Sequence, residues 1–338
     1  KKYFSNNYFH VKKKTGKYPN AKISKPTFKP IEVVNKETES EYSKWLNSLD
    51  KTEFLPRYLN FESDGQSVYL NDNNLLQLYH THNDINNVFN LKMNFEIGSR
   101  QLPTLTPLVS YLNYLGTDKY SVDQFNEKLQ QLGSTLNFNV NPNNFTISVS
   151  GFDNSFEETF KLVSHFLTNL KPDKSKLKKL TKEKKLEDKA IKKSPDDLSK
   201  AIAEKVKFGD KSDYLTRLSL SELKKVTSEQ FLLDLRKVLS TEGNFHYSGT
   251  IPQGLVSQII SENFSVKDVA LKSDNPYYKE GLSYSQPKVF FYNDPKATQS
   301  IVQAYILGPT QAANRDKNLS QLFNIYFGSG MSSLMFQE

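Results

Sequence analysis

The sequence predicts an α+β fold with mixed or antiparallel sheets and helices packed on one face. Strict alternation of apolar and polar residues, typical of half-buried strands, occurs several times along the chain. Between these segments, apolar residues recur every three or four positions, which is typical of helices with one buried face. With 338 residues, of which 37% are apolar, the chain can bury one or two cores.

The two patterns are clearest in one central stretch. Apolar and polar residues alternate over 89–97, which predicts a strand, and helical spacing follows over 105–115. Ser121 opens a second helix, because its hydroxyl can cap the first turn while Gln124 reaches back as the capping-box partner. Two further alternating runs, joined by an Asn-Pro-Asn-Asn turn, predict a hairpin.

The remaining elements follow the same two patterns. Further strands are predicted at 67–70, 75–81, 245–249, 288–292 and 299–307. Further helices are predicted near 42–46, 156–170, 171–193, 198–208, 219–222, 227–238 and 319–326, and from 252 onward. Ser155 and Glu158 predict another capping box at the start of the helix over 156–170.

The central stretch resembles the pitrilysin/insulinase zinc metallopeptidases, peptidase family M16. The shared motifs are Leu115-Gly116-Thr117, Tyr120-Ser121, Leu132-Gly133-Ser134 and the paired hairpin. In active members the first helix carries HxxEH, in which two His bind zinc and the Glu is the general base. Those positions hold Pro107, Ser110 and Tyr111 here, and none can replace an imidazole or a carboxylate. The resemblance therefore implies the non-catalytic C-terminal half of a tandem protein, with no catalytic and no metal-binding residues in this segment.

The resemblance also implies a domain organisation. It predicts two related metallopeptidase-like domains of the LuxS/MPP type, the second of them truncated. Residues 1–40 contain several Pro and a Lys run, which predicts an extended linker, and residues 8–11 suit a strand that finishes a preceding half. The first domain is expected at 41–272, a polar connector at 273–287 and the start of the second domain at 288–338.

The net charge of +8 is concentrated in one predicted helix. Residues 171–193 contain eleven Lys but only four acidic residues. Leu177, Leu180 and Ile191 form an apolar stripe, so we expect a long surface helix with its lysines in water. Nucleic-acid binding is disfavoured because this helix has no Arg or aromatic residue among its lysines. No apolar stretch of the sequence is long enough to span a membrane.

Four His residues are candidates for a functional role. His80 and His82 fall on one face of a predicted strand, which could hold a metal ion. No third ligand lies at motif spacing, so partly exposed His residues with no ligand are the preferred interpretation. His165 is expected at the surface, and His246 is expected to be a satisfied core or edge residue of its strand.

Glu187 is separated from Tyr111 by nearly the spacing at which active family members place their third zinc ligand. Without the two His ligands, a lone carboxylate among lysines is expected to form a helical ion pair with Lys184 or a neighbouring lysine. The chain contains no Cys, which excludes disulfides, thiolate metal sites and Cys nucleophiles.

The preferred functional hypothesis is the non-catalytic half of a zinc-dependent metalloendopeptidase, inactive alone, that encloses peptides together with an HxxEH-bearing half. The expected partners are that catalytic half, in the same polypeptide or a separate subunit, and an unfolded peptide; no nucleic acid is expected. Zinc is expected only in the catalytic half. The resemblance favours the bacterial periplasm or cell envelope. An assembly protein with the same fold and no enzymatic role is the alternative, and an anion-binding module that uses the lysine-rich helix is a third hypothesis.

Overall fold

The structure, a computed structural model, describes residues 16, 39–50, 66–274, 279–295, 300–308, 314–331 and 333–337. The chain divides into two compact units, Lys1–Tyr58 and Leu59–Glu338. In the first unit, helix α1 (Glu41–Ser48) begins where the Ser40 hydroxyl accepts the Ser43 N–H, and it contains no buried residue. The predicted strand at 8–11 lies outside the described residues, and the predicted domain boundaries stay predictions.

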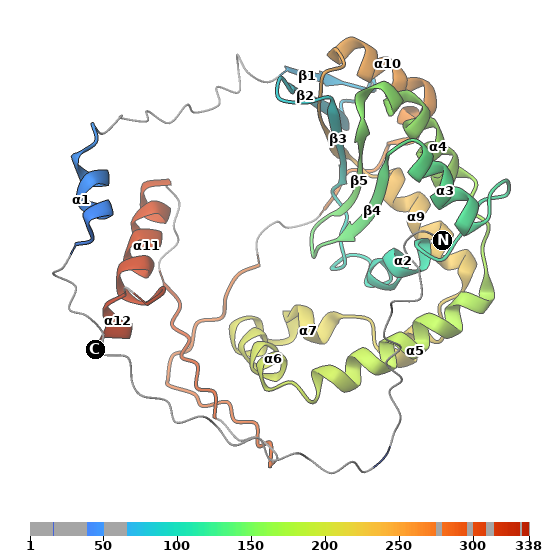
Figure 1. The fold of residues 1–338 in the computed structure, drawn as a ribbon. Coiled ribbons are helices and arrows are strands. Elements are labelled where there is room, and N and C mark those ends of the chain that lie inside the picture. The colour runs from blue at the N-terminus through green and yellow to red at the C-terminus, as the bar shows by residue number, and fades with distance from the viewer. Residues whose placement is uncertain are drawn as a thin grey trace. The chain divides into compact units, whose positions relative to one another are not determined.

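The second unit is built on a six-stranded sheet (Figure 1). Its strands are β1 (Gln66–Tyr69), β2 (Leu76–His82), β3 (Val88–Phe95), β4 (Thr135–Val140), β5 (Phe145–Phe152) and β6 (Gly243–Gly249). The spatial order is β1-β2-β6-β3-β5-β4, with β2 and β6 parallel and every other neighbouring pair antiparallel. The mixed sheet and each strand predicted between residues 66 and 250 are confirmed.

The register gives the sheet one apolar face and one polar face. The apolar face carries Leu76, Leu78, His80, Phe89, Leu91, Met93, Phe95, Phe145, Ile147, Val149, Phe245 and Tyr247. The polar face carries Gln77, Tyr79, Thr81, Asn90, Lys92, Asn94, Thr135, Asn137, Asn139, Thr146, Ser148, Ser150, Asn244, His246 and Ser248. Because side chains alternate along a strand, the sequence alternation places the core on one side of the sheet.

Helices cover the apolar face, as predicted (Figure 1). They are α2 (Leu105–Leu112), α3 (Val122–Gln131), α4 (Phe156–Thr168), α9 (Ser228–Leu239) and α10 (Gln253–Asn263). Each contributes buried apolar residues at helical spacing to the core that the sheet begins. The α+β fold class with helices on one face is therefore confirmed for this unit.

Of the two capping boxes predicted from the sequence, one is confirmed and the other is wrong. Ser121 and Gln124 form both hydrogen bonds of the predicted capping box. Ser155 caps nothing: its hydroxyl donates to the carbonyl oxygens of Leu132 and Phe152 instead. A short 3₁₀ turn, Asp153–Ser155, runs directly into α4, so Ser155 never takes the extended backbone conformation that an N-cap requires.

Four helices lie between α4 and α9 in the chain. They are α5 (Lys174–Ile191), α6 (Pro195–Phe208), α7 (Asp213–Thr216) and α8 (Leu220–Leu223). The predicted helix at 198–208 begins three residues earlier, because the Ser194 hydroxyl caps it and Pro195 takes the first helical position. The sequence did not predict α7.

The part of the chain after residue 279 differs most from expectation. The predicted strands at 288–292 and 299–307 are wrong for their described residues, which are irregular and mostly exposed. A strand requires a hydrogen-bonded neighbour, and none pairs with them among the described residues. The predicted helix is present as α11 (Asn314–Phe327), and α12 (Leu334–Gln337) follows. No helix among the described residues is both long and apolar enough to cross a membrane.

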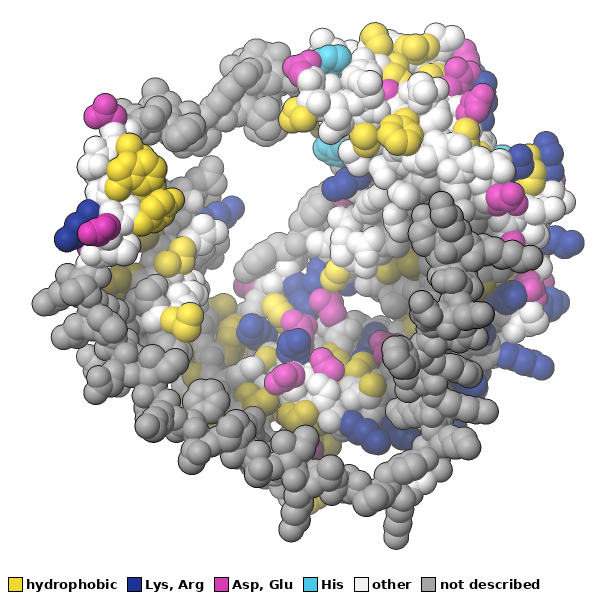
Figure 2. Space-filling model, in the orientation of Figure 1, with side chains coloured by type: hydrophobic (Ala, Val, Ile, Leu, Met, Phe, Trp, Pro, Cys, Tyr) yellow, Lys and Arg dark blue, Asp and Glu magenta, His cyan; other side chains and the backbone are white. Residues whose placement is uncertain are grey.

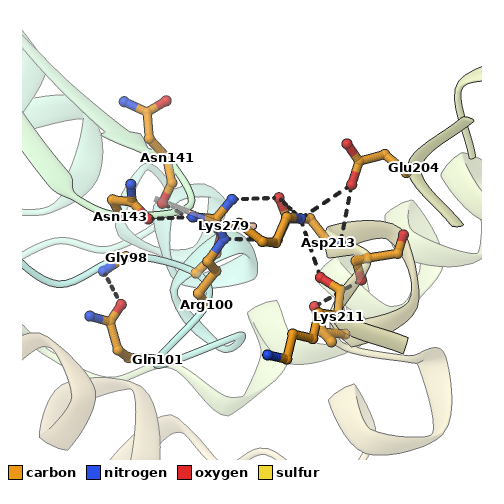
Figure 3. Close-up of polar contacts among 12 residues, drawn as sticks. Gly98, Arg100, Gln101, Asn141, Asn143, Glu204, Lys211, Asp213 and Lys279 are labelled. Carbon is orange, nitrogen blue, oxygen red and sulfur yellow. Dashed lines mark hydrogen bonds and ion pairs between the residues drawn. The ribbon is translucent and has the colours of Figure 1, made fainter. Parts of the chain in front are cut away.

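An ion-pair network joins three distant segments of this unit (Figure 3). The Arg100 guanidinium donates to both carboxylate oxygens of Asp213, at 2.9 Å each, and to Asn143 Oδ1 at 2.7 Å. The Lys279 ammonium lies 3.0 Å from Asp213 Oδ2 and 3.4 Å from Glu204 Oε2. Asp213 therefore connects the hairpin turn to the segment that begins at residue 279.

This network predicts an acid-sensitive contribution to stability. The hydrogen bond from Arg100, and next the one from Lys279, hold the pKa of Asp213 below its ordinary value. A lowered folded pKa stabilises the protein above the ordinary pKa of Asp, about 3.9, and this stabilisation is lost as pH falls through the folded pKa. Asp213→Asn should lower the free energy of unfolding at pH 7 by about 1.5–3 kcal/mol, measured by urea denaturation.

The matched control is Asp210→Asn in the same loop. Asp210 also pairs with a lysine, Lys205, but its side chain is 97% exposed and the pair is screened by water, so its loss should change stability much less than the loss of Asp213. Below pH 4 the stability difference between the wild-type chain and Asp213→Asn should shrink. An equal cost for both variants, or a pH-independent difference, would contradict a special role for Asp213.

Candidate functional site

The candidate site is the face of α2 that corresponds to the HxxEH motif. Leu105, Leu108 and Leu112 bury the opposite side of this helix in the core with at most 1% of their surface exposed. Of the three motif positions, Pro107 and Ser110 are half-buried and Tyr111 is fully buried. Helical geometry therefore places the three residues together, as predicted. Tyr111, which stands where the motif has its second His, is part of the core.

Tyr111 joins α2 to the start of the lysine-rich helix. Its hydroxyl donates to the carbonyl oxygen of Asp173 at 3.1 Å and accepts the N–H of the same residue at 3.0 Å. Asp173 is the N-cap of α5. The Tyr111 ring also packs against Phe231 of α9, with 5.0 Å between ring centroids. Tyr111 therefore contacts two helices at once.

Tyr111 is held as a neutral phenol. Burial of the side chain raises the pKa of Tyr111 above its ordinary value, because a phenolate would lose its hydration. A neutral phenol is a poor ligand for a metal ion, and the Tyr111 hydroxyl is already engaged both as donor and as acceptor. The position can hold helices together, and it cannot act as a general base.

No alternative metal centre replaces the missing motif in the part of the chain that the structure describes. Among those residues, no three His, Asp or Glu side chains lie close enough to hold a metal ion. The expectation that this segment has no catalytic and no metal-binding residue stays a prediction.

Glu187 forms the predicted ion pair. Its carboxylate lies 3.5 Å from Lys184 Nζ, and its side chain is 58% exposed. The carboxylate of α5 that reaches α2 is a different one, Glu183, which accepts a hydrogen bond from the Tyr114 hydroxyl at 2.8 Å. Lys179 Nζ lies 3.7 Å from the centroid of the same Tyr114 ring.

The sequence interpretation missed this cluster of Tyr114, Glu183 and Lys179 beside Tyr111. A signal for it is present in the sequence. Tyr111 lies in the last turn of α2 and Tyr114 three residues later in the turn that follows, while Lys179 and Glu183 are four residues apart on one face of α5. Which helix would meet α2 depended on long-range packing that no local pattern specifies.

His80 and His82 share a face of β2, as predicted, but their surroundings differ. His80 is not partly exposed as expected: it is buried, its Nε2 lies 2.7 Å from the Ile251 carbonyl oxygen, and its ring stacks on Tyr247. His82 is exposed and pairs with Asp84 at 3.0 Å. The two rings are thus engaged by different partners.

His165 is half-buried, whereas the sequence suggested the surface. Its Nε2 lies 3.2 Å from both Thr117 Oγ1 and Asp118 Oδ1, and Nδ1 lies 3.1 Å from Asn169 Nδ2. Because hydroxyl and carboxylate meet the same ring nitrogen, this is not the arrangement of a nucleophilic triad, which needs them on opposite nitrogens. His165 ties the turn after α2 to α4.

His246 lies exposed on the polar face of the sheet. The expectation of a core or edge residue is wrong, because β6 pairs with β2 on one side and with β3 on the other, but the expected hydrogen-bond partner is present. The His246 ring stacks on Tyr79, with 4.9 Å between ring centroids, and its Nε2 lies 2.9 Å from Asn244 Oδ1. Partial burial of the ring, and then the positive charge of Lys92, hold the pKa of His246 below its ordinary value. At neutral pH the ring is therefore uncharged.

Comparison with known proteins gives likeness in structure and none in sequence. No family model matches the chain, and no curated protein matches it. The peptidase M16 inactive domain from Pseudomonas fluorescens is 14% identical, with a TM-score of 0.54 over 62% of this chain and 52% of that chain.

Two proteases are also similar. The periplasmic protease PqqL from Escherichia coli is 16% identical, with a TM-score of 0.50 over 71% of this chain and 28% of that chain. The ferredoxin protease FusC, solved with Arabidopsis ferredoxin, is 12% identical, with a TM-score of 0.53 over 69% and 28%. The chain therefore spans about half or less of each of these structures. The sequence-based resemblance is confirmed at the level of the fold: this chain has the fold of M16-type peptidase domains, an inactive one among them.

Proposed function

We propose that the chain is the non-catalytic half of a zinc-dependent metalloendopeptidase of the pitrilysin/insulinase type. In this role it forms part of the wall around a peptide and supports cleavage by a half that carries HxxEH. The observation that carries the proposal is Tyr111. A position that holds a zinc ligand in active family members is here a buried, neutral side chain bonded to the backbone of Asp173.

The chemistry of the motif positions supports a structural role. Zinc hydrolases need neutral imidazoles or carboxylates on the metal and a base for the attacking water. Pro107 offers no donor atom and Ser110 only a hydroxyl, while both hydrogen-bonding directions of the Tyr111 hydroxyl are in use. Metal-activated hydrolysis would then rest entirely on residues of another half, with zinc held there.

Likeness to proteases and to an inactive domain supports this proposal over a purely scaffolding role with the same fold. We place the protein in the periplasm or cell envelope as part of the proposal, supported by the similarity to a periplasmic protease. Peptide cleavage by the complete protein separates the two roles, because a scaffold would cleave nothing.

The chain alone should bind no zinc at a stoichiometric level. The physical reason is that its motif positions provide no imidazole or carboxylate ligand. Metal analysis after dialysis against a mild chelator measures the content. One tightly held zinc ion per chain would contradict the assignment of Tyr111 to the position of the lost second His.

The chain alone should also cleave no peptide, whereas the complete protein with its HxxEH half should cleave peptides short enough to be enclosed. In the complete protein Tyr111→Phe should retain near-normal turnover, because the ring that packs on Phe231 remains. Loss of turnover by orders of magnitude, with folding intact, would mean that this half takes part in the chemistry.

Stability should respond to Tyr111 more strongly than activity does. Tyr111→Phe leaves the Asp173 N–H without its partner, while the Asp173 carbonyl oxygen keeps the N–H of Lys176, and should cost about 1–2 kcal/mol. Tyr111→Ala also removes the buried ring and should cost at least about 3–5 kcal/mol. Urea denaturation measures both values. Equal, small costs would show that the ring does not contribute to the core.

A further inference from the structure

The exposed side of α5 carries a continuous row of lysines. We define the lysine stripe as Lys178, Lys182, Lys185, Lys189 and Lys192. Their spacing of four, three, four and three residues keeps them on one side of the helix, because an α-helix turns once every 3.6 residues. All five side chains are exposed. The stripe is about 21 Å long at a rise of about 1.5 Å per residue.

The charges of the stripe are not neutralised by the part of the protein that the structure describes. Within the described residues, none of its five lysines takes part in an ion pair. The acidic residues of α5 are engaged elsewhere: Glu183 accepts from Tyr114, and Asp188 binds Lys184 at 2.7 Å and Arg217 at 3.6 Å. Glu187 lies on the opposite side of the helix from Lys178, nine residues away, which is two and a half turns.

The stripe is convex and cannot enclose a ligand. The opposite side of α5 packs on the protein through Leu180, which is 3% exposed, and through the half-buried Leu177 and Ile191. Figure 2 shows dark-blue side chains projecting outward at the lower right, where Figure 1 places α5. A straight row of charges on a protruding helix can touch a flat surface along its whole length, and it offers no groove for a peptide.

The chemistry of the stripe distinguishes between anionic partners. Recognition of nucleic acid uses Arg forks and aromatic stacking, and the stripe contains neither. Lys is a compact, strongly hydrated point charge, suited to attraction toward a diffuse layer of negative charge without loss of its water. Leu180 is buried and Leu177 and Ile191 are half-buried against the protein, so Leu186 is the one large apolar side chain of α5 that is exposed. Because a single leucine offers little apolar surface for insertion, the helix can lie on an anionic bilayer without inserting into it.

We propose that the lysine stripe of α5 docks the protein on the surface of a membrane rich in anionic phospholipid. The attachment is electrostatic and reversible, and it needs no membrane-spanning segment. Each lysine near such a surface contributes a factor of about five to binding, so the stripe as a whole is sufficient for salt-sensitive association. This inference concerns where the protein works and does not depend on whether it supports proteolysis.

The test is co-sedimentation of the full chain with vesicles of phosphatidylcholine containing about one third phosphatidylserine, compared with pure phosphatidylcholine. We expect binding only to the anionic vesicles, abolished near 1 M salt, where charges are screened beyond about 3 Å. The variant Lys178→Gln, Lys182→Gln, Lys185→Gln and Lys189→Gln should bind roughly 600-fold more weakly, a factor of about five for each lysine. Gln has nearly the helix propensity of Lys, so the helix should remain.

The matched control replaces four exposed lysines outside α5 by Gln, with the same loss of net charge. These are Lys224, Lys225, Lys237 and Lys267. The control should keep most of the vesicle binding. No binding to anionic vesicles, or equal weakening in both variants, would overturn the proposal. Stripe-dependent binding of a DNA duplex or a polyglutamate peptide in the absence of vesicle binding would assign the stripe to that polymer instead.

Discussion

Two hydrogen bonds between the Tyr111 hydroxyl and the backbone of Asp173 fix the start of α5 against α2. The direction of α5, and with it the meeting of Tyr114 with Glu183, follows from that attachment. A buried phenol can serve in this way because one oxygen both donates and accepts, and so satisfies a helix N-cap residue on both of its backbone groups. The same two bonds are what make Tyr111 useless to a metal ion.

Under the proposed function, a position that binds zinc in active family members serves in this chain as a packing position. A His pair and a carboxylate facing a metal need charge, water and an open coordination site, all of which oppose burial. An aromatic ring against Phe231 needs only space within the core. The candidate site thus contributes to the stability of the helix layer, and any chemistry belongs to a partner half under the proposed function.

The sequence predicted the sheet because its two faces differ in polarity, so that alternation in β3 and β5 reports burial directly. Prediction from the sequence failed for side chains that could bond to more than one partner. Ser155 found carbonyl acceptors instead of capping α4, and His80 met the Ile251 carbonyl across the chain. The bridge from Arg100 through Asp213 to Lys279 joins segments that are 113 and 66 residues apart in the chain, and no local pattern contains that information.

The excess of lysine has two physical outcomes that composition does not distinguish. Lys184 and Lys279 have side chains only 14% and 11% exposed, and each has carboxylate partners, so their charge contributes to the packing of helices. The lysines of the stripe remain in water with no partner among the described residues, so their mutual repulsion is relieved only by salt or by an external anion. Lys184 and Lys185 are neighbours in sequence, yet Lys184 is half-buried in ion pairs and Lys185 is exposed without one among the described residues. The turn of the helix between them causes this difference. Binding by this chain to an anionic surface would for that reason depend on a helix face and not on net charge.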